Sequence, residues 1–557
     1  MAEAQGSPTH RDSEGTAGPR VHQVLARGIT DLGVGTLFGL MGDGNLWLID
    51  SFVKEQGGTY VGATHEANAV LMASGFAQRS GGIGVATVTH GPGLTNTVTA
   101  LTDAARARIP MVVIAGDTPA EMRDHSQKLA QREVVIPTGA GFELMRSPAT
   151  ALVDLATAFR RAVAERRPVV LNIPRQLQLA VTEDAGTVVI PAAPQSPGPD
   201  PEALDVALGI VASARRPLIL AGRGAEHARD GLVALADRIG ALLATTLQGQ
   251  SIFQGHAYDL GLFGSLSTET ALEAIGEADC VISFGAGLNR HTTVEGALLS
   301  GKAVVQCDMH PEALGRYTPV DATVLGDAGR VAEAMLTSLV EAEIGGLRAR
   351  DESLARRLAE ERERTLGHDA PEGPLDVRAA LAQIARAIPE GRSVTTDLGR
   401  FVIDAWKAVT VTAPRAYVHT NNFGSIGLGM GYAIGMTYAR PDEPVVLVTG
   451  DGGFMMGGLA ELGTAVRHGR DLIVVVVDDG AYGAEHVQFR NRGLDPDLTT
   501  FAWPDIAGVA RALGAEALTV RVPADLDGVA EFVRTRRGPI LIDLLVAPEA
   551  VLARGFA

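Results

Sequence analysis

Two stretches of the sequence decide its fold: Pro444 to Gly453 reads PVVLVTGDGG, and Leu472 to Gly483 reads LIVVVVDDGAYG. Each is a short apolar run, which indicates a buried strand, followed at once by acidic residues and a glycine turn. A helix is expected between them, from about Gly458 to His468, so the strands lie parallel in one sheet. Because parallel strands end at the same edge of a sheet, we expect Asp451 and the Asp478–Asp479 pair to lie close together there. This carboxyl edge is where open α/β folds bind ligands.

These acidic turns have the composition of a magnesium and phosphate site. Carboxylates and backbone oxygens suit a hard cation such as Mg²⁺. The free N–H groups of Gly452 and Gly453, at a helix start, suit the phosphates that such a cation carries. The alternative is that the two acidic turns only cap the helices that follow them. The residues by themselves leave both interpretations open.

Strand and helix patterns alternate over almost the whole chain, in three blocks. We expect an α/β fold of three domains, each a mainly parallel sheet flanked by helices. The expected domains cover residues 20–185, 195–345 and 370–550. A proline-rich linker, Pro191 to Pro201, follows the first, and a charged helix-prone segment, Ala342 to Leu366, precedes the third. Residues 1–19, polar and without the apolar run of a secretory signal, are expected to be a disordered leader.

Apolar runs and Ala-rich segments give the individual elements. The expected strands are 82–89, 110–115, 168–173, 217–221, 280–284, 303–307, 394–396, 445–448, 472–477 and 540–545, and the expected helices include 67–79 and 149–165. Glycine is abundant, with 66 in 557 residues, as many tight strand-to-helix turns require.

Charge and cysteine content restrict the class of protein. The 48 basic and 65 acidic side chains give a net charge of −17, which argues against nucleic acid or an anionic membrane as the main partner. The only cysteines, Cys280 and Cys307, exclude a disulfide framework and are expected to be buried. No apolar run reaches the roughly 18 residues of a membrane-spanning helix. We therefore expect a cytoplasmic protein.

Two nucleotide-binding motifs are incomplete. Gly296 to Lys302 (GALLSGK) has the spacing of a P-loop, but Ala303 follows where a serine or threonine would bind magnesium. Gly222-Arg223-Gly224 follows a strand, as dinucleotide motifs do, but lacks the third glycine. Neither motif predicts a nucleotide site.

Motifs of the first and third blocks resemble those of one family. The GDG of Gly450 to Gly452 is followed about 26 residues later by paired acidic residues and a glycine turn. Thr64 to Ala67 reads THEA, and His90 to Asn96 reads HGPGLTN. Together these motifs resemble the thiamine diphosphate-dependent enzymes of the acetolactate synthase, pyruvate decarboxylase and benzoylformate decarboxylase superfamily, over about residues 20–545. The resemblance implies pyrimidine-binding, central and diphosphate-binding domains, in that order.

The resemblance also implies the cofactors, thiamine diphosphate and Mg²⁺, and the residues that bind them. Glu66 matches the glutamate that hydrogen-bonds N1′ of the cofactor's pyrimidine ring. Asp451, Asp479 and the Ala481 carbonyl match the Mg²⁺ ligands, although Asp479 replaces the usual asparagine and Asp478 is an alternative ligand. The spacing is one residue longer than usual, because of an extra glycine in Met456-Gly457-Gly458. The other implied cofactor-binding residues are Gly399, Arg400, Gly424, Ser425, Ile426, Gly450, Gly452, Gly453, Tyr482 and Gly483.

Several side chains that match positions facing the substrate can carry protons. Asp43 and Glu485 fall on carboxylate positions of pyruvate decarboxylase, and His90 on a catalytic histidine of benzoylformate decarboxylase. His125 and Gln127 lie in a loop that reaches the site in relatives. The alternatives are that Asp43 caps the helix after it and that Glu485 forms an ion pair.

These residues favour decarboxylation of a 2-oxo acid, with release of an aldehyde or transfer of the acyl anion to a second carbonyl. One alternative is an acetolactate synthase-like carboligase without functional FAD, since Gly287 stands where that family's FAD segment has arginine. A remote alternative is a non-catalytic cofactor-binding paralogue. The resemblance implies a homodimer or homotetramer with active sites between chains.

Overall fold

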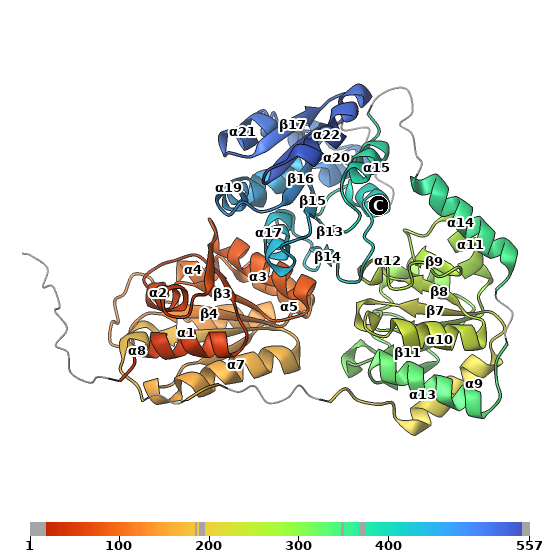
Figure 1. Cartoon of the computed structure of the whole chain (residues 1–557), viewed down its shortest axis with the longest axis horizontal. Helices are drawn as coiled ribbons and strands as arrows, with labels where there is room; N and C mark the ends of the chain where they lie inside the picture. The colour runs from red at the N-terminus through yellow and green to blue at the C-terminus, as the bar shows by residue number, and fades with distance from the viewer. Residues whose placement is uncertain (1–17, 184–185, 189–194, 347–349, 367–374, 548–557) are drawn as a thin grey trace, which may run out of the picture.

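The computed structural model describes residues 18–183, 186–188, 195–346, 350–366 and 375–547. It contains three sheets of six strands each, and neighbouring strands within every sheet run parallel. Figure 1 shows the three bodies: the first in red and orange, the central one in yellow and green, and the third in blue. The expected α/β class with three parallel sheets is confirmed.

The strands of the three sheets are the following. The first sheet contains β1 (Thr36–Gly39), β2 (Thr59–Gly62), β3 (Gly84–Val88), β4 (Met111–Asp117), β5 (Gly141–Leu144) and β6 (Pro168–Pro174). The second contains β7 (Pro217–Ala221), β8 (Leu242–Thr245), β9 (Asp259–Leu262), β10 (Cys280–Phe284), β11 (Ala303–Asp308) and β12 (Ala322–Leu325). The third contains β13 (Ser393–Thr396), β14 (Tyr417–His419), β15 (Val445–Gly450), β16 (Leu472–Asp478), β17 (Glu516–Val520) and β18 (Ile540–Leu545).

Helices flank all three sheets. The first body has α1 (Val21–Asp31), α2 (Leu46–Lys54), α3 (Glu66–Ser80), α4 (Pro92–Thr95), α5 (Val98–Arg106), α6 (Gln131–Val135), α7 (Ala151–Glu165) and α8 (Arg175–Leu179). The second has α9 (Pro201–Ser213), α10 (Arg229–Ile239), α11 (Glu269–Glu277), α12 (Arg290–Thr293) and α13 (Ala328–Glu341), followed by α14 (Glu352–Leu366). The third has α15 (Val377–Ala387), α16 (Val402–Ala408), α17 (Gly429–Ala439), α18 (Asp451–Gly453), α19 (Leu459–Arg467), α20 (Gly483–Asn491), α21 (Ile506–Ala512) and α22 (Val529–Thr535).

The order of the strands shows that the first and third sheets are alike. Their orders, β2-β1-β3-β4-β6-β5 and β14-β13-β15-β16-β18-β17, are the same arrangement, whereas the central order, β12-β11-β10-β7-β8-β9, is that of a classical dinucleotide-binding fold. The central strands of each sheet are buried over almost their whole length, as expected for parallel sheets covered on both faces. Cys280 and Cys307 are buried, as expected.

The helix-prone segment expected at 342–366 contains α14, which begins at Glu352. One expected helix differs from the structure. The helix expected from about 458 begins already at Asp451 and continues through a π-helical turn, Phe454–Gly458, into α19. Most of the expected leader and part of the proline-rich linker lie outside the described residues, and the domain limits stay a prediction.

The first and third bodies share one hydrophobic core where α3 packs on α17. The helices approach so closely that a Cβ on Gly75 would overlap the Tyr432 carbonyl, and a Cβ on Gly435 would overlap the Met72 carbonyl. The far end of α3 is held by Arg79, which donates to Ser393 Oγ at 2.6 Å and to Glu443 Oε2 at 2.5 Å. The packing of α3 on α17 fixes the middle of α3 relative to the third sheet.

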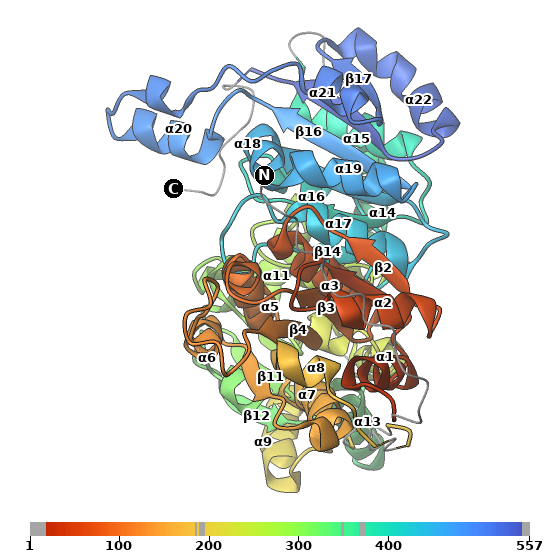
Figure 2. The same ribbon diagram turned by 90° about the vertical axis from the view of Figure 1, so that its left-hand side faces the viewer.

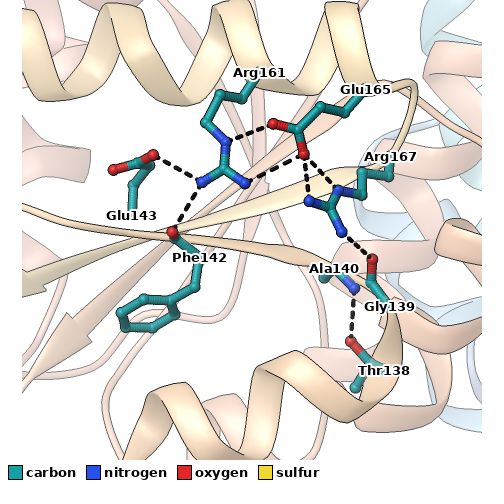
Figure 3. A network of polar contacts seen from close by, with 8 residues as sticks. All are labelled: Thr138, Gly139, Ala140, Phe142, Glu143, Arg161, Glu165 and Arg167. Carbon is teal, nitrogen blue, oxygen red and sulfur yellow. Dashed lines mark hydrogen bonds and ion pairs between the residues drawn. The ribbon is translucent and has the colours of Figure 1, made fainter.

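A polar network joins α7 to the edge of the first sheet (Figure 3). Arg161 donates to Glu165 and to Glu143, each at 2.7 Å, and to the Phe142 carbonyl at 3.0 Å. Glu165 also accepts from Arg167 at 2.7 Å, and its pKa is lowered chiefly by the hydrogen bond from Arg161. The network lies partly in solvent, so it stabilises the edge only modestly. Among the described helices, none is both long and apolar enough to cross a membrane.

Candidate active site

Glu66 stands at the carboxyl edge of the first sheet. The chain leaves β2 at Gly62, and α3 begins at Glu66 after the N-cap His65. The Glu66 side chain is buried, at 8% exposure, and one carboxylate oxygen accepts a hydrogen bond from Asn96 Nδ2 at 2.9 Å. Asn96, the last residue of the HGPGLTN motif, therefore fixes the orientation of this carboxylate.

His90 lies just after β3 at the same edge, where loops from two other strands meet it. A Cβ on Gly44 would lie 2.6 Å from His90 Nδ1, so the backbone after Asp43 packs against the ring. His125 meets the His90 ring edge to face, with centroids 5.2 Å apart. A Cβ on Gly91 would overlap the Gln127 carbonyl, so the loop that carries His125 also covers this motif.

Asp43 does not cap a helix. Asn45 occupies the N-cap position of α2, and the half-exposed Asp43 carboxylate forms an ion pair with Arg175 Nε at 2.7 Å. The alternative that Asp43 caps the helix after it is therefore wrong. The charge of Asp43 acts instead on His90, since it partly offsets the lowering of that residue's pKa.

His90 provides a test of the electrostatics of this edge. Its pKa is lowered, first by burial and then by the neighbouring His125 ring. We expect His125→Asn to remove the second contribution and raise the pKa of His90 towards 6.5, so that its imidazole gains a proton at a higher pH. Titration of ¹³C-labelled histidines by NMR would measure this shift. A His90 pKa that stays unchanged or falls would contradict the contact.

Asp451 and Asp479 stand at the carboxyl edge of the third sheet. Asp451 Oδ1 accepts from the Gly452 N–H at 2.8 Å, and its Oδ2 accepts from Trp503 Nε1 at 2.8 Å. Asp479 forms an ion pair with Arg400 at 2.5 Å and accepts from the Ala481 N–H at 3.2 Å. The sequence prediction that these turns follow adjacent parallel strands is confirmed, because β15 pairs with β16.

The carboxyl groups at this edge outnumber the positive charges that face them. Burial, followed by the Asp479 charge, raises the pKa of Asp451 to about 8, and burial also raises the pKa of Asp478 and of Asp479. Arg400 pairs with one of the three. A divalent cation would offset this excess of negative charge, so the donor set fits Mg²⁺. Since the described residues hold no group of three or more His, Cys, Asp or Glu side chains arranged to bind a metal alone, the ion would also need carbonyl and phosphate oxygens.

Asp397, which the sequence analysis missed, organises the loops around this cluster. Its Oδ1 accepts from the Leu398 N–H at 2.7 Å, and its Oδ2 accepts from the Gly427 N–H at 2.9 Å and from Thr449 Oγ1 at 3.4 Å. Burial raises the pKa of Asp397 to about 6. One side chain thus holds together the three loops that contain Gly399, Gly424 to Ile426, and Gly450 to Gly453.

At some positions in these loops there is space for glycine but not for a larger residue. A Cβ on Gly452 would lie 2.7 Å from Tyr482 Cε1 and 4.0 Å from Ile426 Cδ1, so both side chains face this glycine. Tyr482 packs edge to face on Phe501, which stacks on Trp503. The result is a small-residue cradle at a helix start, next to an aromatic wall, and it fits a diphosphate.

Glu485 lies apart from the other expected catalytic residues. It is exposed on α20, which Figure 2 shows standing out from the body of the molecule. In the part of the chain that the structure describes, no ion pair involves Glu485, so the ion-pair alternative has no support. Among the described residues, no hydrogen bond or ion pair joins the site residues at the edge of the first sheet, such as Glu66 and His90, to those at the edge of the third sheet, such as Asp451.

Comparison with known proteins adds independent information. Three segments match the domains of thiamine pyrophosphate enzymes: residues 19–135 the N-terminal TPP binding domain, 204–335 the central domain, and 397–544 the C-terminal TPP binding domain. A Pseudomonas aeruginosa protein named "Probable 2-ketoarginine decarboxylase AruI" is 31% identical, over 94% of this chain and 93% of that protein.

Two further relatives carry other names. The acetolactate synthase of Arthrospira platensis is 27% identical, over 92% of each chain. The sulfoacetaldehyde acetyltransferase of Rhodobacter capsulatus is 28% identical, over 89% of this chain and 88% of that protein. The relatives thus include proteins named as a decarboxylase, a synthase and an acetyltransferase.

Proposed function

The chain belongs to the thiamine pyrophosphate enzyme family, and from this premise we propose that it is a Mg²⁺-dependent enzyme that decarboxylates a 2-oxo acid. The product is an aldehyde or, when the acyl group passes to a second carbonyl, a hydroxy ketone. The observation that carries this proposal is the grouping of Asp43, His90 and His125 at the sheet edge that also presents Glu66. Such proton-carrying groups are what an aldehyde-releasing enzyme requires.

The third sheet would hold the diphosphate end of the cofactor. Asp451, Asp479 and the Ala481 carbonyl would bind Mg²⁺, and the N–H groups of Gly452 and Gly453 would face the phosphates. The remaining contacts would come from Gly399, Arg400, Gly424, Ser425, Ile426, Gly450, Tyr482 and Gly483. When bound, thiamine diphosphate supplies a carbon centre that adds to a 2-oxo acid and takes up the electron pair left by departing CO₂.

Residues at the edge of the first sheet would carry out the proton transfers. Glu66, held by Asn96, would share a proton with N1′ of the pyrimidine ring. His90 is kept neutral at pH 7 by its lowered pKa, so it can accept a proton from substrate or solvent. Asp43 and His90 of one chain and Glu485 of another would deliver a proton to the carbon that loses CO₂, and the loop that carries His125 and Gln127 would cover the HGPGLTN motif.

An acetolactate synthase-like carboligase without functional FAD is the second candidate. One relative is named an acetolactate synthase and another an acetyltransferase. In the central body a Cβ on Gly222 would overlap the Gly285 carbonyl, so the turns after β7 and β10 close on each other, and Arg223 donates to the Ala107 carbonyl of the first body at 2.8 Å.

A panel of 2-oxo acids, with CO₂ and carbonyl products identified by mass spectrometry, tests the proposal. The panel should include 2-ketoarginine, because one relative is named for it. We expect CO₂ release that depends on thiamine diphosphate and Mg²⁺, with an aldehyde as the main product. Release of hydroxy ketones alone would favour the carboligase.

Glu485 distinguishes these two outcomes. We expect Glu485→Gln to slow aldehyde release by about 10²-fold or more while CO₂ release in a single turnover changes little, because the variant lacks one proton donor. With an added acceptor aldehyde, its products should shift towards 2-hydroxy ketones. Chromatography with and without acceptor measures this ratio, with Glu516→Gln, an exposed glutamate on β17, as the control. Unchanged aldehyde release would show that Glu485 takes no part in the reaction and would favour the carboligase.

We also propose a cytoplasmic homodimer or homotetramer in which Glu66 of one chain faces Asp451 of another. Met41 is 52% exposed and Met456 is 57% exposed in the single chain, and both side chains would become buried in this arrangement. The absence of a direct contact between the two groups within the described residues agrees with it.

A further inference from the structure

One helical segment runs from the proposed metal site to the turn that presents Glu66. It begins at Asp451, passes through the π turn, and ends at Arg467. Its C-terminal half lies along residues 62–68 of the first body, where Arg467 donates to the Gly62 carbonyl at 2.8 Å and Asn68 Nδ2 donates to the Gly457 carbonyl at 3.2 Å. These two contacts lie on either side of Glu66 in the sequence.

Between them lies Glu461, which is fully buried. One of its carboxylate oxygens accepts three hydrogen bonds: from the Thr64 N–H at 2.7 Å, from Thr64 Oγ1 at 2.5 Å and from the His65 N–H at 3.1 Å. The other oxygen has no hydrogen-bond partner among the described residues. A buried carboxylate that accepts three hydrogen bonds restrains the backbone of the donor residues. Its loss would leave two backbone N–H groups without a hydrogen-bond partner.

The segment between Asp451 and Glu461 contains the glycine that makes the family spacing one residue longer than usual. The π turn accommodates this residue. Phe454–Gly458 accommodates one residue more than an α-helical turn, so the helix before it and the helix after it keep their own orientations. Gly457 is needed there, since a Cβ would overlap the Gly427 carbonyl of the loop that contains Ile426. The π turn is thus packed against the cofactor loop on one side and against Asn68 on the other.

We propose that Glu461 is a positioning residue for Glu66, acting through the Thr64–His65 backbone. The inference rests on the proposed function for the role of Glu66, but not for the contact itself. Because Glu66 directly follows His65, the three hydrogen bonds fix where the Glu66 carboxylate lies relative to N1′ of a bound cofactor. A displacement of about 1 Å at such a group lowers rates by as much as 10²-fold.

The first test measures the contact in the full-length apoprotein. In Glu461→Leu, the amide hydrogens of Thr64 and His65 should exchange with solvent at least tenfold faster, measured by hydrogen exchange and mass spectrometry of a peptide spanning 62–70. Glu461→Gln keeps the accepting oxygen and should stay within about threefold of the wild type. Arg79→Met, which loosens the opposite end of α3, is the matched control and should not alter this peptide.

The second test measures the consequence for Glu66. Exchange of the thiazolium C2 proton of bound thiamine diphosphate in D₂O, followed by NMR, should slow by about 10- to 100-fold in Glu461→Leu, with cofactor affinity unchanged. Glu461→Gln should restore it, and Arg79→Met should leave it at the wild-type rate. Thr64→Val, an exposed site that removes one of the three donors, should slow it two- to fivefold and serves if Glu461→Leu does not fold.

The outcomes separate the two proposals. If Glu66→Gln abolishes C2 exchange while both Glu461→Leu and Thr64→Val keep the wild-type rate, the positioning role is wrong and the proposed function stands. If Glu66→Gln itself exchanges at the wild-type rate, the proposed function fails. The amide exchange of Thr64 and His65 then still decides whether Glu461 holds this turn.

Discussion

Glu66→Gln is expected to lower turnover by about 10³-fold or more while the fold and the affinity for cofactor stay close to those of the wild type. A carboxyl group can share a proton with the ring nitrogen that it faces, whereas a carboxamide cannot. The carboxamide should still accept the hydrogen bond from Asn96, so the local structure persists. Steady-state CO₂ release, thermal unfolding and calorimetric titration with thiamine diphosphate measure the three quantities.

The matched control is Glu55→Gln, an exposed glutamate of the same body that hydrogen-bonds Gln23 and Ser51. It should keep full turnover. Wild-type turnover in Glu66→Gln would show that this carboxylate has no part in the chemistry. Loss of both turnover and fold would instead identify a structural role.

Asp451→Asn should weaken binding of thiamine diphosphate with Mg²⁺ by about 10²-fold or more, because the metal loses a charged ligand. The unfolding temperature of the apoprotein should not fall, since the change removes a charge from three crowded, buried carboxyl groups. Calorimetric titration with and without Mg²⁺ measures the affinity. Asp471→Asn, which alters a carboxylate at the opposite end of β16 that pairs with Arg536, should leave the affinity unchanged.

Unchanged affinity in Asp451→Asn would remove the proposed metal site. The paired variants Asp478→Asn and Asp479→Asn then identify the second ligand, since the true ligand should show the larger loss of affinity. Mixing Glu66→Gln with Asp451→Asn tests the assembly: if sites form between chains, hybrid dimers contain one intact site, and activity should return to about a quarter of the wild-type level. No recovery after subunit exchange would place both residues in one chain's site.

The parts of this structure that follow from local pattern were predictable. Apolar runs such as 217–221, 280–284 and 540–545 coincide with β7, β10 and β18, because a buried parallel strand needs continuous apolar character. The position of Asp451 and Asp479 at one sheet edge followed from the same argument. Asp397 carries the same signal, an acidic residue directly after a strand, and could have been found by it.

Other features depend on contacts distant in the sequence. Trp503 reaches Asp451 across 52 positions, and Glu461 reaches Thr64 across 397. No periodicity encodes such pairs. The extra glycine near Gly457 was visible, but its accommodation as a π turn depends on packing against Gly427 and Asn68.

The central claim is that this chain activates bound thiamine diphosphate through Glu66, and exchange of the cofactor's C2 proton tests it without knowledge of the substrate. In D₂O with Mg²⁺, the wild-type protein should exchange this proton at least about 10³-fold faster than free cofactor, and Glu66→Gln should reduce the rate to nearly that of free cofactor. Exchange by the wild-type protein at the rate of free cofactor would contradict the claim and leave a protein that binds the cofactor without using it.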